Sequence, residues 1–518
     1  NSENAAVVDQ EHLGGVIGQC EGSIVDCTNR GTVDQASDPR TVNAGGICGF
    51  VRNAAESLSG NANEGEVRIG GAVTLATVGG VYGSFGKAQT VADAATTNRG
   101  GVTVSGIESI EGAYLRLGGI VGFAYPGTVL SNLTNAGDMT VDLQSKFSYY
   151  AVGGIAGSVE CGASSCVNEG SLRLNNNQLL TKGMCKIFVG GIVGINYRPT
   201  DDGPHIYEDC ANRAEIGFAT TDNAFKVLPS FTGGILGYTE HPVEVRNCEG
   251  AAYINVNNAN AKENGIFTAT GGIVGAVKGT AALIEKCHVT ADVRHYQYNN
   301  TWDGPLSAAN GGGIVGCALG ADEVNRIAIT GCSCSGMVES KRSGAAGIVG
   351  YARFSDISDC GFTGGIEGSG PHFAGGIAGT LANSTIAGCT VKAKNIYGHN
   401  ASSPSLIGVS GIAAYVVGVS SVSDCKAYAT LIRNSTVLGT EDASVTPDNL
   451  FGMGMIVGID AGTTTVTNCG VGGSFYLGAS EKPQELILTL DADSYAKGII
   501  GSGKTATVGG CYYWNGEE

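Results

Sequence analysis

One short segment gathers many of the side chains that could recognise a ligand. From residue 294 to 303 the sequence reads RHYQYNNTWD, and it holds one of the two tryptophans of the chain. Flat aromatic rings beside polar groups suit the faces of sugars or the centre of a protein interface. The candidate ligand-binding residues are Arg294, His295, Tyr296, Tyr298, Trp302 and Asp303. The same composition also fits a packed loop that covers the core, so both interpretations stay open.

Cysteine recurs at one position of a repeated element, apolar-x-x-Cys-x-Asn-x-Gly-x-apolar, which accounts for eleven of the 17 cysteines. These are Cys27, Cys166, Cys210, Cys248, Cys287, Cys332, Cys360, Cys389, Cys425, Cys469 and Cys511. Side chains stacked at one repeat position point the same way, which is poor geometry for disulfides, and no two Cys-x-x-Cys pairs converge on a metal. We expect a structural ladder of free, buried thiols, without a metal or cofactor.

No sequence motif predicts catalysis. The chain lacks the His-Glu-x-x-His and Gly-x-Ser-x-Gly patterns, and its seven histidines are scattered among different repeats. The pair Asp201 and Asp202 lacks the alternating ligands of a calcium loop. We expect a protein that is not an enzyme. A polysaccharide lyase or hydrolase remains the alternative by fold analogy, because parallel β-helices often carry such chemistry.

The charge balance limits the choice of partners. With 30 basic and 47 acidic side chains, the net charge is −17, which repels phosphate backbones and anionic lipid head groups. Nucleic acid is therefore not an expected partner. The chain opens with Asn-Ser-Glu-Asn, so we expect any export signal to have been removed or to lie outside this sequence.

Repeats must position all these residues. A pentapeptide of the form Gly-Gly-Ile-Val-Gly recurs fourteen times, from Gly14 to Lys497, at an average spacing of about 37 residues, and the cysteine element follows it. Short apolar runs alternate with Gly, Asn and Asp turn signals, and no amphipathic helical period is sustained. The pattern predicts three short strands per repeat. Equivalent strands would pair in parallel from coil to coil, about 4.8 Å apart.

The 84 glycines and the repeated asparagine have a structural interpretation. Glycine is expected at positive-φ corners and where backbones approach closely. The asparagine of the Cys-x-Asn-x-Gly element is expected to form a ladder and to take a left-handed corner conformation.

The pentapeptide and the Cys-x-Asn-x-Gly element together resemble the GLUG repeat, found in surface proteins of Bacteroidetes and beside immunoglobulin A protease domains. The resemblance covers essentially the whole chain. It implies an exported surface protein, often adhesive, and it supplies no catalytic residues.

We therefore predict an all-β fold, a parallel β-solenoid of about 14 repeats averaging about 37 residues. It would form one domain over 1–518, with 1–13 as a possible N-terminal cap and 502–518 as a C-terminal cap or junction. The expected function is a non-catalytic scaffold or adhesin, exported to the bacterial surface or beyond, whose insert loops bind a glycan or a surface or host protein. Membrane attachment would be peripheral, through an anchor such as that of a lipoprotein. The alternative is a purely structural spacer or filament component.

Overall fold

The computed structural model describes most of the chain in two units. The described residues are 10–35, 41–142, 147–176, 186–197, 203–220, 230–258, 268–297, 309–341, 344–367, 373–400, 407–435, 452–479, 482–503 and 506–517. Contacts divide the chain into two compact units, Asn1–His241 and Pro242–Glu518, and each is described by itself. The single domain over 1–518 stays a prediction.

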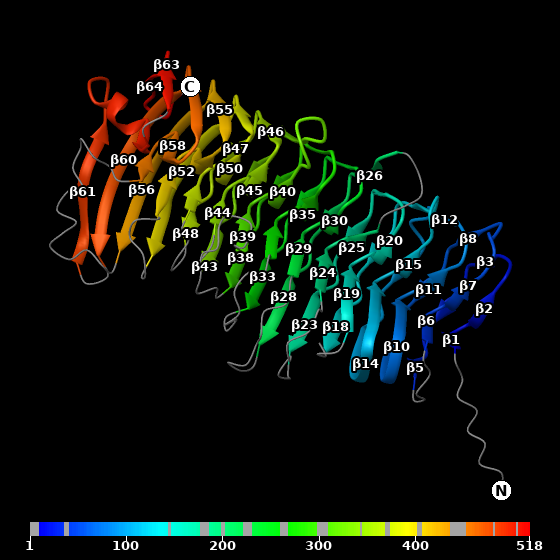
Figure 1. The fold of residues 1–518 in the computed structure, drawn as a ribbon. Coiled ribbons are helices and arrows are strands. Elements are labelled where there is room, and N and C mark those ends of the chain that lie inside the picture. The colour runs from blue at the N-terminus through cyan, green and yellow to red at the C-terminus, as the bar shows by residue number, and fades with distance from the viewer. Residues whose placement is uncertain are drawn as a thin grey trace, which may run out of the picture. The chain divides into compact units, whose positions relative to one another are not determined.

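The first unit is a parallel β-solenoid (Figure 1). The coil that begins at the Gly153 pentapeptide shows its pattern of five strands. They are β20 (Ala156–Val159), β21 (Ala163–Ser164), β22 (Val167–Asn168), β23 (Leu172–Asn176) and β24 (Lys186–Gly190). Five strands replace the predicted three. The left-handed residue Ser165 separates β21 from β22, and β23 and β24 lie on either side of residues 177–185.

Equivalent strands of the first unit pair in parallel from one repeat to the next. The strands that follow the pentapeptides form one such ladder. They are β2 (Ile17–Cys20), β7 (Cys48–Val51), β11 (Tyr82–Phe85), β15 (Val121–Ala124), β20, β25 (Val193–Asn196) and β30 (Leu236–Thr239). Ala156 pairs with Val193, one repeat later, so each repeat makes one coil of the solenoid.

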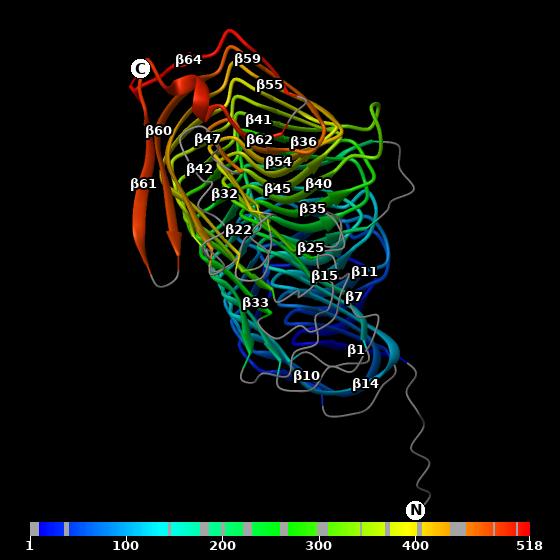
Figure 2. The ribbon, with the colours of Figure 1, turned by 60° about the vertical axis from the view of Figure 1, so that its left-hand side comes forward.

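The second unit has the same architecture, as its stacked coils show in Figure 2. Its corresponding ladder consists of β35 (Val274–Lys278), β40 (Val315–Leu319), β45 (Val349–Arg353), β50 (Ala378–Ala382), β54 (Ala413–Val417), β58 (Val457–Asp460) and β62 (Ile500–Ser502). The described residues contain no α-helix, and the one 3-10 helix is Tyr495–Gly498. The predicted fold class, an all-β parallel solenoid, is confirmed. No described helix is long and apolar enough to cross a membrane.

The two predicted cap segments contain ordinary coil strands. Strand β1 (Gln10–Gly14) pairs in parallel with β6 (Thr41–Gly45). Near the other end, β63 (Thr507–Gly509) and β64 (Tyr512–Tyr513) pair with β59 (Thr463–Thr467) and β60 (Gly470–Ala479). The departure from coil geometry is β61 (Lys482–Leu490), which runs antiparallel beside β60 (Figure 2).

The pentapeptide glycines are required by space rather than by a left-handed backbone. A methyl group on Gly153 would lie 1.9 Å from the carbonyl oxygen of Ala156. On Gly154 it would lie 2.1 Å from the carbonyl oxygen of Gly191 and 2.3 Å from Cγ of Asn168. On Gly157 it would lie 2.5 Å from the backbone nitrogen of Leu117 in the previous coil. The backbones before and after the pentapeptide therefore meet at a separation that only glycine allows.

The second glycine of a pentapeptide in the first unit is covered by the asparagine side chain of the Cys-x-Asn-x-Gly element. In the first unit these residues form an amide ladder, which consists of Asn29, Asn63, Asn98, Asn135, Asn168 and Asn212. The Nδ2 group of Asn135 donates to Oδ1 of Asn168 at 2.8 Å and to the carbonyl oxygen of Gly137 at 3.1 Å. Asn98, Asn135 and Asn168 are fully buried, so the ladder satisfies amides that water cannot reach.

The second unit fills the same place mostly with apolar side chains. We call the residue two positions after the cysteine position the rung of its repeat. The rungs of the second unit are Gly250, Val289, Cys334, Phe362, Val391, Ala427 and Val471. A methyl group on Gly347 would lie 2.2 Å from Cγ of Phe362, and one on Gly376 would lie 2.9 Å from Cγ1 of Val391. The contact with the glycine pair is therefore kept while its chemistry changes from amide to hydrocarbon.

The predicted left-handed conformation of the ladder asparagine is wrong. Asn135 lies in the strand β17 (Thr134–Asn135), and its register with Asn168 requires an extended backbone. The left-handed residue lies directly before the cysteine position instead, where the coil turns. The non-glycine residues that take this conformation there are Asp26, Asn132, Ser165, Asp209, Asn247, Lys286, Asp359, Asp424 and Asn468, with φ between 51° and 56°.

A single methyl group tests the close approach. Gly154→Ala should destabilise the first unit by about 1–3 kcal/mol or more, because neither the Gly191 carbonyl nor the Asn168 side chain can move without breaking the ladder. Gly22→Ala is the matched control, because nothing lies within 4 Å of a methyl group there. Chemical denaturation followed by circular dichroism measures both variants. Equal midpoints for the two would contradict the packing account.

Candidate functional site

The described part of the 294–303 segment forms a charged and aromatic cluster on the second unit. Strand β38 (Val293–Gln297) carries Arg294, which pairs with Glu339 of the next coil, on β43 (Val338–Lys341). Arg294 donates from Nε to Oε2 of Glu339 at 2.6 Å and from Nη2 to Oε1 at 3.2 Å. Such a bidentate pair fixes the guanidinium plane. The cluster is therefore a rigid feature of the coil surface.

Two tyrosines lie against this guanidinium. Its central carbon is 5.1 Å from the ring centroid of Tyr296 and 5.4 Å from that of Tyr253. The hydroxyl of Tyr296 donates to the same Oε2 of Glu339. Burial, followed by this bond to Glu339, raises the pKa of Tyr296 to about 12. Hence the phenol stays protonated near neutral pH, and Tyr253, Arg294, Tyr296 and Glu339, which we call the Arg294 cluster, form a partly exposed polar and aromatic surface.

His295 is not a surface residue. It is fully buried, and its ring nitrogens lie 2.7 Å from Oγ1 of Thr270 and 3.2 Å from Oγ1 of Thr268. The reason is the alternation of a β-strand, which directs Arg294 and Tyr296 outward and the residue between them inward. Its predicted role in ligand binding is therefore wrong. The predicted residues Tyr298, Trp302 and Asp303 lie outside the described residues.

Sequence reasoning missed Glu339 and Tyr253. A signal for Glu339 exists, since Asn255, Arg294 and Glu339 each lie seven residues after the cysteine of their own repeat and share one rung. Aligning the repeats on their cysteines would therefore have placed Arg294 beside Glu339. Tyr253 offers no comparable signal, because it contacts Arg294 from the residue before a strand.

The inserts of the second unit leave and rejoin the coils at equivalent places. Strands β33 (Ile254–Asn258), β38 and β43 pair with one another before the inserts. Strands β34 (Thr268–Gly271), β39 (Ala309–Gly312) and β44 (Gly344–Ala346) pair with one another after them. Inserts of different length therefore start from one common register, and Tyr296 lies directly at the base of one of them.

The predicted thiol ladder is placed in the core. Nine of its eleven members are buried, while Cys27 and Cys511 are partly exposed. A typical member, Cys360, has its Sγ 3.2 Å from the carbonyl oxygen of Ser358 and 3.6 Å from that of Ile329 in the previous coil. Sixteen of the 17 cysteines lie among the described residues, and all sixteen are free thiols.

The ladder thiols differ in pKa, because hydrogen bonds from neighbouring thiols lower the pKa of Cys332 and Cys425. Contacts with Cys360 and Cys425, together with burial, raise the pKa of Cys389 well above the ordinary value for a thiol. A neutral, buried thiol is a poor nucleophile and a poor metal ligand. Within the described part of the chain, no group of three or more His, Cys, Asp or Glu side chains could hold a metal ion. The nine buried ladder thiols therefore fill space in the core as small side chains.

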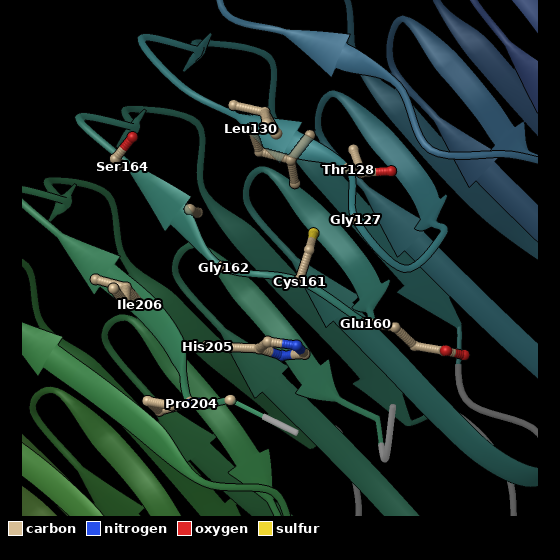
Figure 3. Close-up of a pocket in the computed structure, with 13 residues that line it drawn as sticks. Gly127, Thr128, Leu130, Glu160, Cys161, Gly162, Ser164, Pro204, His205 and Ile206 are labelled. Atoms are coloured by element: carbon tan, nitrogen blue, oxygen red, sulfur yellow. The ribbon is translucent and has the colours of Figure 1, made fainter. Parts of the chain in front are cut away.

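A groove of about 430 Å³ lies on the first unit, between three successive coils (Figure 3). It is lined by Gly127–Leu130, Glu160–Ser164 and Gly203–Ile206, and most of its surface is apolar. The imidazole of His205 contributes to it, with Nδ1 2.8 Å from Oδ1 of Asn196. Glu160 is the one carboxylate among the described lining residues, whereas glycoside hydrolysis needs two carboxyl groups. Asp201 and Asp202, at which the sequence predicts no calcium loop, lie outside the described residues.

Comparisons of this chain with protein-family models, with curated proteins and with solved structures found no match.

Thiol titration tests the ladder. Denatured, unreduced protein should react with a thiol reagent at most of its 17 cysteines, and the native protein should react quickly only where the described thiols are partly exposed, at Cys27 and Cys511. The Cys27→Ser, Cys511→Ser variant should lose this fast reaction. A count near zero after denaturation would mean that the cysteines form disulfides and would refute the ladder.

Proposed function

We propose that this protein is a non-catalytic scaffold of the cell surface or the extracellular space, and that the Arg294 cluster and its adjoining insert bind a glycan. The observation that carries the proposal is the pair of tyrosine rings held against a fixed Arg294–Glu339 pair at the base of an insert. Loops on a rigid repeat scaffold are where recognition residues concentrate.

The charges of the cluster favour a neutral sugar. Glu339 already neutralises Arg294 through two hydrogen bonds, so a ligand carboxylate would have to compete with an internal one. Sugar hydroxyls can both donate to Glu339 and accept from Arg294, while the pyranose face packs on a tyrosine ring. The expected ligand is therefore a neutral oligosaccharide.

Export is consistent with the chemistry of the core. Buried thiols are shielded from oxidants, so a free-thiol ladder can persist outside the cell. The net charge of −17 keeps the chain soluble. The resemblance of its repeats to the GLUG repeat points the same way.

A glycan array with the purified chain tests the proposal. Tyr253→Ala, Tyr296→Ala should weaken binding of neutral glycans by about tenfold or more, because both aromatic contacts are lost. Tyr512→Ala is the matched control, since this tyrosine is 42% exposed and lies on β64. Circular dichroism checks that both variants stay folded. Unchanged glycan binding by the double variant, or no glycan binding by the natural chain, would contradict the proposal.

A further inference from the structure

A second aromatic surface lies on the first unit. Tyr114 of β14 (Val102–Gly118) pairs in register with Tyr149 of β19 (Phe147–Gly153). Their ring centroids are 4.7 Å apart and their planes are inclined by 56°. Tyr114 is 40% exposed, and Tyr149 is partly exposed. Tyrosine rings that neighbouring coils present side by side offer a flat apolar face with a polar edge, which suits the recognition of a ligand.

An arginine lies beside these rings on the next outward position of β14. The Nε group of Arg116 donates to the hydroxyl oxygen of Tyr149 at 3.0 Å, and its central carbon lies 4.4 Å above the ring of Phe123. These two contacts hold the guanidinium in place. Tyr114, Arg116 and Tyr149, which we call the tyrosine platform, therefore combine flat rings with a positioned cation.

Arg116 differs from Arg294 in one decisive respect. Arg294 is paired with Glu339, whereas Arg116 has no carboxylate partner in the described part of the chain. A guanidinium carries more N–H donors than one bond to a phenol uses, and its planar fork matches a carboxylate. Most described arginines form an ion pair with a carboxylate, as Arg30, Arg52 and Arg326 do. The charge of the missing partner can be supplied by a ligand.

We propose that the tyrosine platform binds an acidic oligosaccharide, with its carboxylate on Arg116 and a sugar ring on Tyr114. The two tyrosines are repeated along the coil axis, at a spacing comparable with the length of one sugar unit in an extended chain. An acidic peptide would share the carboxylate but would not need the exposed ring. This site is independent of the Arg294 cluster, and its ligand class differs because the two arginines differ in their internal partners.

Isothermal titration of the full chain tests the assignment. The probes are a galacturonic acid trisaccharide, a sialylated trisaccharide, the carboxyl-reduced neutral form of the first, and a short polyglutamate peptide. At least one acidic sugar should bind, and its neutral form should bind about tenfold more weakly or not at all. Arg116→Ala and Tyr114→Ala should each weaken the acidic sugar by about tenfold or more.

The controls separate this site from a general charge effect and from the proposed neutral-glycan site. Arg173→Ala removes an exposed arginine from β23 and should leave the affinity unchanged. Tyr253→Ala, Tyr296→Ala should also leave acidic-sugar binding intact, so the two proposals can fail separately. Tyr114→Ala alters an exposed side chain, which keeps the test valid if Arg116→Ala unfolds. The assignment would be overturned if neither acidic sugar binds, if Arg173→Ala weakens binding as much as Arg116→Ala, or if polyglutamate binds equally well and independently of Tyr114.

Discussion

The first unit depends on the close approach of two backbone segments at each pentapeptide, whereas in the second unit Ala346, Ser410 and Met455 stand at some of the equivalent glycine positions. Gly153 and Gly154 lie so near to backbone oxygens that no side chain fits at either residue. The fifth residue, Gly157, meets the backbone of the preceding coil in the same way. The repeat is therefore a steric pattern, in which glycine leaves room for a neighbouring coil. Residue type and repeat length can vary outside these glycine positions. Repeats of unequal length therefore stack with one register.

A rung side chain packs against each glycine pair. It is an amide in the first unit and mostly an apolar group in the second. In the first unit the amides bond to one another, as Asn98 does to Asn135 and Asn135 to Asn168. In the second unit residues such as Val391 and Phe362 fill the space with hydrocarbon. A fully connected amide chain and an apolar stack are both tolerated in a core, whereas a mixture of the two would leave unsatisfied amides. Each ladder is therefore kept uniform over consecutive coils.

The sequence alone could predict the fold because its signals repeat. The pentapeptide, the cysteine position and the ladder asparagine each recur at a nearly constant offset, and parallel stacking places equivalent residues together. The corner was assigned to the wrong residue, because Asn135 can form either a left-handed turn or a strand rung. Only the neighbouring coil, by offering Asn168 as a partner, decides between these conformations.

The candidate sites could be predicted only in part, because their members come from different coils. Arg294 and Tyr296 were found as one composition-rich segment, but Glu339 lies 45 residues away in sequence from Arg294. Tyr114 and Arg116 belong to no enriched segment, and they meet Tyr149 only through the stacking of β14 on β19. The inward direction of His295 follows from strand alternation once the strand is known. The residues of a surface site on a solenoid therefore come from neighbouring coils rather than from one continuous segment of the chain.

The most direct measurement of this account compares two identical substitutions three residues apart. Asn135→Asp removes both N–H donors of a fully buried rung and places a carboxylate beside the Asn168 amide oxygen. Asn132→Asp changes a left-handed corner residue, a conformation that Asp26 and Asp209 already adopt. At neutral pH, chemical denaturation should show a loss of about 3–5 kcal/mol for the first variant and almost none for the second. Equal stability of the two variants would contradict the account.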